Sequence, residues 1–223
     1  MAPNLNPSTS VKTAAARNPT ADKLLLAASE LMIENNSIDV SLSEIAHRSG
    51  VNAALVKYHF GNKDGLLLAL LARDAATEMT NLDYLMAQPI TATAKLKLHI
   101  AGIMRAYQQF PYMNRLIHHL LHGSNTEAAD EVAKFFVGPL LEFHRRLLAE
   151  GYETGEFRKI DPVLFYTSLI GACDHLFFYR HAMSRAIGVG PVTDEVCREY
   201  VAHLDAMILG GMLINKNRAE ATA

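Results

Sequence analysis

The side chains between Val51 and Leu66 could make a dense set of hydrogen bonds to nucleic acid. This stretch reads VNAALVKYHFGNKDGL and brings Lys57, Tyr58, His59 and Lys63 close together in the sequence. A lysine can donate to a phosphate or to the edge of a guanine base. Tyrosine and histidine can donate to phosphate oxygens, which positions a protein on DNA without reading its sequence. We therefore expect this segment to bind DNA.

Two short helices joined by a turn would present these side chains. The preceding stretch, SLSEIAHRSG, fits a capping box between Ser41 and Glu44, and Gly50 would end that helix. Asn52 can then cap a second helix, which would end before Gly61. This arrangement predicts a helix-turn-helix motif at about residues 41–60, whose second helix would enter the major groove.

Helical spacing divides the motif into a packed face and a DNA face. The residues expected to pack against the first helix of the chain are Ile45, Ala46, Val51, Leu55 and Val56. Small side chains allow close approach to bases, and serines at a helix N-terminus form a natural phosphate site. The predicted DNA-binding residues are Ser41, Ser43, Asn52, Ala53, Ala54, Lys57, Tyr58, His59 and Lys63.

The rest of the chain also has helical spacing, and no segment alternates as a strand does. Thr20 can cap a first helix, and a long fourth helix is expected at about 63–87. Further helices are expected at about 91–109, 112–122, 126–151, 161–187 and 192–214. The fold class is therefore all-α. We expect a flexible N-terminal arm (1–19), a helix-turn-helix DNA-binding domain (20–66) and a helical effector-binding and dimerisation domain (67–218).

Composition limits the possible classes of protein. The formal net charge is −2, so DNA binding must come from a local patch and not from a strongly basic chain. Cys173 and Cys197 are too few for a disulfide framework and suit a reducing compartment. The longest apolar run, at about 66–72, is far shorter than the ~20 residues of a membrane span. We expect a soluble cytoplasmic protein without membrane partners.

The stretch SLSEIAHRSGVNAALVKYHFGNKDGLLLALL resembles the DNA-binding domain of the TetR family of bacterial transcriptional regulators. YHFGNKDGLL is its most specific part, and the resemblance covers about residues 18–78. It implies a bacterial one-component repressor that binds a partly palindromic operator as a homodimer and is released by a small molecule. It also implies phosphate contacts by Ser41, Tyr58, His59 and Lys63. Family members commonly have Tyr where this chain has Lys57, which makes Lys57 the residue expected to individualise the operator.

The C-terminal two thirds are expected to form a homodimer and to bind a largely apolar effector. Small residues such as Gly171 and Gly210 lie among large ones in the last two helices, at about 161–187 and 192–214. Such residues let helices of two subunits approach closely. The predicted ligand-binding residues are Met104, Tyr107, Phe110, Arg115, His118, Phe136, Phe165, Tyr166, Asp174 and His175; Met113 belongs to the wider apolar set.

Two alternatives to an effector-released regulator stay open. The first is a helical small-molecule-binding protein in which the helix-turn-helix is only structural. The second is a metal-responsive regulator, because IHHLLHG places His118 and His122 on one helical face. We expect no catalytic residues, metal or cofactor, since the sequence has no GxSxG, no glycine-rich phosphate loop and no CxxC.

Overall fold

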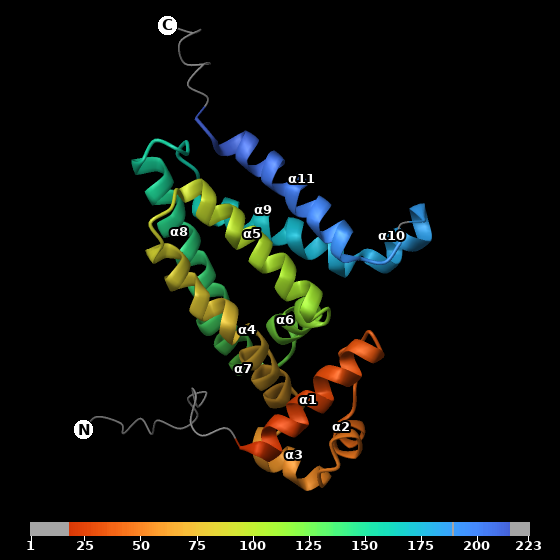
Figure 1. The fold of residues 1–223 in the computed structure, drawn as a ribbon. Coiled ribbons are helices and arrows are strands. Elements are labelled where there is room, and N and C mark those ends of the chain that lie inside the picture. Colours follow the sequence, from red (N-terminus) through yellow and green to blue (C-terminus); the bar gives the residue numbers. More distant parts are fainter. Residues whose placement is uncertain (1–17, 189, 215–223) are drawn as a thin grey trace, which may run out of the picture.

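The protein folds into a small helical head and a larger helical body, and the computed structural model describes residues 18–188 and 190–214 (Figure 1). The head contains α1 (Pro19–Glu34), α2 (Leu42–Ser49) and α3 (Ala53–Phe60). The Asn18 side chain caps α1 by accepting from the Thr20 N–H at 3.0 Å. The predicted cap at Thr20 is therefore wrong by two residues, because Pro19 already occupies the first turn, where its missing N–H has no cost. The expected arm at 1–19 lies almost wholly outside the described residues.

The body is built from long and short helices. Its elements are α4 (Lys63–Ala87), α5 (Ala92–Gln109), α6 (Met113–His122), α7 (Thr126–Val132), a π-helical turn η1 (Ala133–Val137), α8 (Gly138–Glu153), α9 (Pro162–Phe178), α10 (Arg180–Ile187) and α11 (Asp194–Met212). Helix α4 runs through the predicted domain boundary at residues 66 and 67 and joins the head to the body (Figure 1).

Two of the long predicted helices are interrupted. Within the expected helix 126–151, the N–H of Gly138 bonds to the carbonyl of Ala133, which closes a wide π-helical turn. Pro139 lacks an N–H group and clashes with the carbonyl four residues earlier, so a wider turn relieves the helix there. The expected helix 161–187 breaks at Tyr179, with φ −92° and ψ 2°, into α9 and α10. No proline or glycine marks this second break in the sequence.

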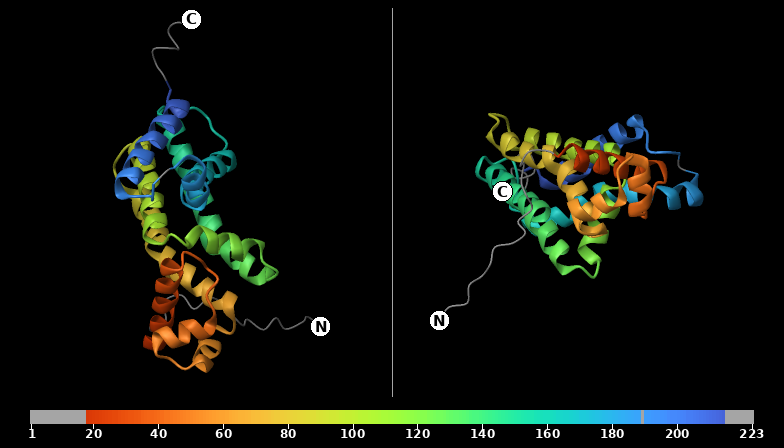
Figure 2. Two further views of the ribbon diagram at one scale, coloured as in Figure 1. Left: turned by 90° about the vertical axis from the view of Figure 1, so that its right-hand side faces the viewer. Right: turned by 90° about the horizontal axis from the view of Figure 1, so that it is seen from below.

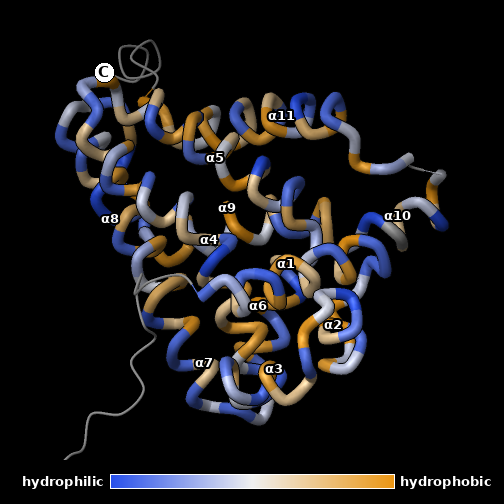
Figure 3. Tube along the Cα trace, turned by 60° about the horizontal axis from the view of Figure 1, so that its bottom comes forward, coloured by the Kyte–Doolittle hydropathy of each residue, from blue (hydrophilic) through white to orange (hydrophobic). Residues whose placement is uncertain are grey.

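One continuous apolar core runs from the head into the body. Both apolar and polar residues occur along the helices (Figure 3), and the apolar ones recur at helical spacing, so that each helix can turn an apolar face inward. The left view in Figure 2 shows the head at one end of the elongated molecule. An isolated bridge between Phe157 and Leu213 ties the end of α11 to the segment after α8. None of the described helices is long and apolar enough to cross a membrane.

Candidate DNA-binding surface and effector cavity

Helix α3 lies at the end of the head and turns most of its side chains to solvent. Val56 is the one buried residue of this eight-residue helix, and it is fully buried. Lys57 is exposed and has no ion pair among the described residues, and the Tyr58 side chain is 80% exposed. Ala53 and Ala54, also exposed, leave the N-terminal turn of α3 without bulk. This surface combines free donors with room for close approach.

Leu55 does not pack as the spacing predicted. Its side chain is 39% exposed, whereas its neighbour Val56 is buried against the head. Successive helical residues point about 100° apart, so a helix held by a single buried position turns the residue before it away from the core. Leu55 therefore belongs to the exposed face of α3. Ile45 and Ala46 of α2 are buried, as predicted.

The N-terminus of α2 is capped as the sequence predicted. The Ser41 hydroxyl accepts from the Glu44 N–H at 3.1 Å, and Glu44 Oε2 accepts from the Ser41 N–H at 2.7 Å. The Ser41 hydroxyl also hydrogen-bonds to the Glu44 carboxyl, and Ser43 is exposed beside it. Hydrogen bonds from Ser41 to the Glu44 carboxyl lower its pKa, so this carboxylate stays ionised at the same helix end.

Two other cations near this surface are already paired within the protein. Lys63 Nζ lies 3.1 Å from Asp39 Oδ1, and the Asp39 side chain is 93% exposed. A solvent-exposed pair of this kind is worth little, so a DNA phosphate can replace the carboxylate. Arg48, in contrast, binds Glu34 through two hydrogen bonds of 2.8 and 2.6 Å on the surface of the head. Asn52 and Asn62 cap α3 and α4.

A buried hydrogen-bond network fastens the head to the body. The hydroxyl of Tyr112, which immediately precedes α6, lies 2.7 Å from Ser29 Oγ of α1 and 2.5 Å from Asp74 Oδ2 of α4. Arg73 donates to the other carboxylate oxygen at 2.7 Å. Burial raises the pKa of Tyr112, which keeps its proton available for these bonds.

A second junction is formed by two arginines that converge on Asn36, just after α1. Arg115 of α6 donates to the Asn36 backbone carbonyl at 2.7 Å and to its side-chain oxygen at 3.0 Å. Arg180 of α10 donates to the same side-chain oxygen. Asn36 has a φ of 50°, a left-handed conformation that asparagine tolerates better than most residues. Tyr112 and Arg115, at the start of α6, therefore hold the head at two separate points.

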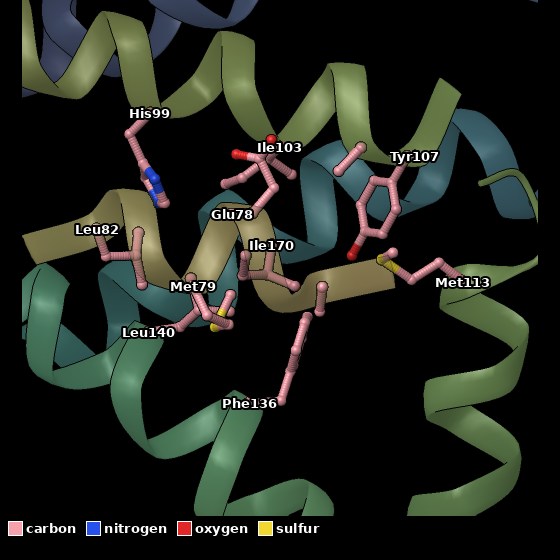
Figure 4. Close-up of a pocket in the computed structure, with 12 residues that line it drawn as sticks. Glu78, Met79, Leu82, His99, Ile103, Tyr107, Met113, Phe136, Leu140 and Ile170 are labelled. Atoms are coloured by element: carbon pink, nitrogen blue, oxygen red, sulfur yellow. The ribbon is translucent and has the colours of Figure 1, made fainter. Parts of the chain in front are cut away.

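The body contains a cavity of about 40 Å³ between α4, α5, α6, η1, α8 and α9 (Figure 4). Its wall is mostly apolar and is formed by Ala75, Glu78, Met79, Leu82, His99, Ile103, Ala106, Tyr107, Met113, Phe136, Leu140 and Ile170. Burial raises the pKa of Tyr107, so its hydroxyl stays protonated as a possible donor. An apolar wall with few polar groups is typical of a small-molecule site.

A pair of buried histidines borders this cavity. Nε2 of His99 lies 2.8 Å from Nε2 of His144 on α8, and the two residues are 5% and 0% exposed. Burial, with a smaller effect of His144, lowers the pKa of His99 to about 3, and burial lowers the pKa of His144 to about 4. Both rings are therefore neutral near pH 7, and one donates to the other. Nδ1 of His144 has no hydrogen-bond partner.

The predicted ligand-binding residues lie in several places. Tyr107, Phe136 and Met113 line the cavity. Met104 is buried in the core beside it, Phe110 is half-buried near Tyr112, and Arg115 contacts the head. Phe165 and Tyr166 pack around His144, and Phe165 also borders a hollow between α9 and α11.

Three polar residues predicted to bind the ligand, His118, Asp174 and His175, are partly exposed and lie outside the cavity wall. His118 Nε2 lies 3.5 Å from Asp174 Oδ2, and His175 stacks on Tyr179. His118 also stacks on His122.

Sequence reasoning missed the α4 wall and the histidine pair. Ala75, Glu78, Met79 and Leu82 recur at helical spacing on α4, and this was the signal that could have found them. His99 and His144 are 45 positions apart, so nothing local connects them.

Known protein families match both the N-terminal head and the C-terminal body of the chain. Residues 24–70 match the family described as bacterial regulatory proteins, tetR family, and residues 89–218 match the tetracyclin repressor-like C-terminal domain. The HTH-type transcriptional regulator BetI of Brucella anthropi is 41% identical over 49 residues. That match covers 22% of this chain, which spans only about a quarter (25%) of the length of BetI.

Several solved structures share the fold over most of the chain. FadR from Bacillus halodurans, a fatty acid degradation regulator, has a TM-score of 0.69 and 22% identity, and the match covers 88% of this chain and 98% of that one. A TetR/AcrR family regulator from Thermobifida fusca has a TM-score of 0.64 and 23% identity, with 84% and 97% covered. Bacillus subtilis FadR, solved with stearoyl-CoA, has a TM-score of 0.63 and 21% identity, with 85% and 95% covered.

Proposed function

Because the chain belongs to the TetR family of bacterial transcriptional regulators, we propose that it is a homodimeric repressor released from its operator by a small molecule in the α4–α9 cavity. The observation that carries this proposal is the exposed face of α3, where Lys57 and Tyr58 point to solvent beside two alanines. The alternative of a merely structural helix-turn-helix gives no reason for this arrangement.

The predicted DNA contacts fall into two kinds. Lys57 and the small N-terminal residues of α3 would meet base edges in the major groove. Tyr58, His59 and the hydroxyl of Ser43 would donate to phosphates and set the position of the head, and the Ser41 hydroxyl would do so in place of its hydrogen bond to Glu44. Lys63 would give up its ion pair with Asp39 and bind a phosphate instead. With so few cationic contacts per subunit, strong binding needs two heads acting together.

Lys57→Ala is expected to weaken operator binding by roughly 1–3 kcal/mol if Lys57 contacts a base edge. The loss would then be larger for the operator than for unrelated DNA, which anisotropy titrations on both duplexes measure. A loss equal on all sequences, together with a shallower salt dependence, would instead assign Lys57 to a phosphate. Lys134→Ala, which removes an exposed lysine of the body, is the matched control. An unchanged affinity for both duplexes would remove Lys57 from the DNA surface.

The homodimer is proposed to form through α9 and α11. Apolar side chains are exposed along these helices, among them Leu164 at 69% and Met207 at 55%. A side chain added at Gly171 or Gly210 would meet nothing within 4 Å, so a second subunit has room to approach the backbone. A hollow of about 250 Å³ between the two helices offers a place for a partner side chain. Burial of this surface in a twofold interface would account for its composition.

Release from the operator is proposed to start at the cavity wall. Ala75 and Met113 line the cavity, and their sequence neighbours Asp74 and Tyr112 bond to each other and, through Tyr112, to Ser29 of the head. A ligand that displaces α4 or α6 would therefore move the head directly. Operator binding requires the two recognition helices about 34 Å apart, so a small rotation of each head is enough. The ligand shifts this equilibrium only by binding more tightly to the dimer whose two recognition helices do not have this spacing.

Tyr112→Phe is expected to destabilise the protein by about 1–2 kcal/mol, because Asp74 and Ser29 lose a buried partner. It is also expected to reduce the ratio of operator affinities measured without and with the effector, since one of the two junctions is lost. Denaturant unfolding and anisotropy titration provide the two measurements. Tyr84→Phe, at an exposed position of α4, is the control and should change neither. A full effector response in Tyr112→Phe would contradict this route.

A further inference from the structure

Two arginines of the body meet at the head on one neutral side chain, that of Asn36. Arg115 of α6 donates to the Asn36 carbonyl at 2.7 Å, to the Asn36 side-chain oxygen at 3.0 Å and to the Pro111 carbonyl at 3.4 Å. Arg180 of α10 donates to the same side-chain oxygen of Asn36. All of these acceptors are uncharged, so they satisfy hydrogen bonds but compensate neither positive charge.

Within residues 18–188 and 190–214, no carboxylate forms an ion pair with either arginine. Helices α6 and α10, which carry the two arginines, contain no Asp or Glu. Glu34 lies two residues before Asn36, but its carboxylate is bound by Arg48. In the described part of the chain, the pair at Asn36 is therefore a double positive charge without a counter-charge.

Arg115 and Arg180 are also partly buried, unlike the other arginines that lack an ion pair. Within the described residues, those others are exposed: Arg105, Arg158, Arg185 and Arg198. Burial lowers the pKa of Arg115, and the positive charge of Arg180 lowers it further. Burial likewise lowers the pKa of Arg180. A charge withdrawn from water is costly unless an opposite charge faces it, so an anion is the ligand that suits this pair.

The pair also has more hydrogen-bond donors than the surrounding protein has acceptors. A guanidinium has five N–H groups in a planar fork that matches the oxygens of a carboxylate or a phosphate. Hydrogen bonds to the described residues use one nitrogen of Arg180, which leaves the other donors of its fork for a ligand. Nε of Arg115 is buried and has no hydrogen-bond partner in the described part of the chain. An oxyanion with several oxygens would supply acceptors where donors are in excess.

We propose that Arg115 and Arg180 bind a phosphate group that bridges α6 and α10 beside Asn36. Inorganic phosphate or a phosphate monoester carries about two negative charges above its second pKa of about 6, which matches two guanidiniums. Its tetrahedral oxygens can accept from both forks at once, whereas a carboxylate has one charge and two oxygens in a plane. This site is separate from the α4–α9 cavity and from the exposed face of α3, and it does not depend on the proposed function.

Phosphate binding would fasten α10 to the junction between body and head. None of the described side chains of α10 is buried, so apolar packing contributes little to holding this helix. Tyr179 interrupts the helix just before α10, and the hydrogen bond from Arg180 to Asn36 ties α10 to the head. A phosphate between the two guanidiniums would replace their repulsion by attraction and hold α10, α6 and Asn36 together.

Calorimetric titration of the full-length protein with inorganic phosphate and with methyl phosphate tests the site. The pH is 7.5, the buffer contains no phosphate, and sodium chloride keeps the ionic strength at about 0.15 M. We expect saturable binding of at least one of the two probes, and about tenfold or more weaker binding of acetate. Binding of inorganic phosphate alone identifies the free ion as the ligand, whereas binding of methyl phosphate identifies a phosphate ester. Absence of saturable binding by both probes overturns the inference, and so does acetate that binds as tightly.

Variants locate the bound phosphate. Arg180→Gln should weaken its binding about tenfold or more, because one fork is lost. Arg185→Gln removes an exposed arginine of the same helix and should leave phosphate binding unchanged, as should Lys57→Ala on α3. Unchanged binding in Arg180→Gln, or an equal loss in Arg185→Gln or Lys57→Ala, would place the phosphate elsewhere and overturn the proposal.

Thermal unfolding provides the second measurement. Phosphate should raise the unfolding temperature of the unchanged protein more than that of Arg180→Gln, since the general stabilising effect of the anion acts on both. An equal rise in the two proteins would contradict the site. If Arg180→Gln does not fold, Arg180→Lys takes its place: it keeps the charge but loses the fork, and should also weaken phosphate binding.

Discussion

Gly65→Ala is expected to destabilise the head by about 3 kcal/mol and to abolish operator binding. A Cβ at this position would lie 2.0 Å from the backbone carbonyl oxygen of Phe60, the last residue of α3. Backbone atoms cannot move aside as the end of a side chain can, so the turn between α3 and α4 would have to open. The Asn62 cap, which accepts from the Gly65 N–H at 2.8 Å, would be lost with it. Because α3 carries the DNA surface, stability and DNA binding should fall together.

Denaturant unfolding at a fixed protein concentration, with anisotropy on operator DNA, measures both effects. Gly190→Ala is the control, since a Cβ there meets nothing within 4 Å and the residue is exposed between α10 and α11. We expect it to change stability by less than about 0.5 kcal/mol. If Gly65→Ala is as stable as the unchanged protein, the prediction is contradicted, because the turn between α3 and α4 would then accept a side chain at this position.

Acidification from pH 7.5 to pH 5 is expected to cost about 4 kcal/mol of stability through His99 and His144. Their pKa values are lowered to about 3 and about 4 in the folded protein, whereas an unfolded histidine titrates near its ordinary value of 6.5. Below about pH 6.5 the unfolded chain binds protons that the folded chain cannot bind, so stability falls with pH. The loss continues until the folded-state values are reached. Free energies of unfolding measured across this range test the prediction.

The double variant His99→Phe with His144→Leu isolates this effect. It removes both titrating groups together, so neither is left buried without its partner. Most of the loss of stability between pH 7.5 and pH 5 should disappear. His203→Gln, at an exposed histidine, should leave the loss unchanged. If the double variant loses as much stability on acidification as the unchanged protein, other groups determine the acid sensitivity.

Much of the head was predictable because its signals are local. The capping box of Ser41 and Glu44 and the turn at Gly50 each depend on residues within a few positions of one another. The limits of α4 follow in the same way from Asn62 before it and Pro89 after it. Leu55, which was predicted to pack and is instead exposed, shows the limit of such signals. The length of α3 and its single buried residue decide which way Leu55 faces.

The site within the body was predictable only in part, because it depends on contacts between distant helices. Composition indicated an apolar pocket and included Tyr107 and Phe136. It could not show that Arg115 turns away from the pocket to hold Asn36, a residue 79 positions earlier. Nor could it show that His99 meets His144, because each lies in an ordinary amphipathic helix. Both depend on how α5, α6 and α8 are oriented, which periodicity leaves open.

The central claim is that α3 binds a specific DNA sequence, and one measurement tests it most directly. Fluorescence anisotropy of the full-length protein is measured on labelled DNA from upstream of its own gene and on DNA selected from random sequences. Salt is kept at about 0.15 M and competitor DNA is present. We predict tight, competitor-resistant binding to at least one of these DNAs, lost in Tyr58→Ala. Binding to both that is no tighter than to unrelated DNA, or that is unaffected by Tyr58→Ala, would contradict the account.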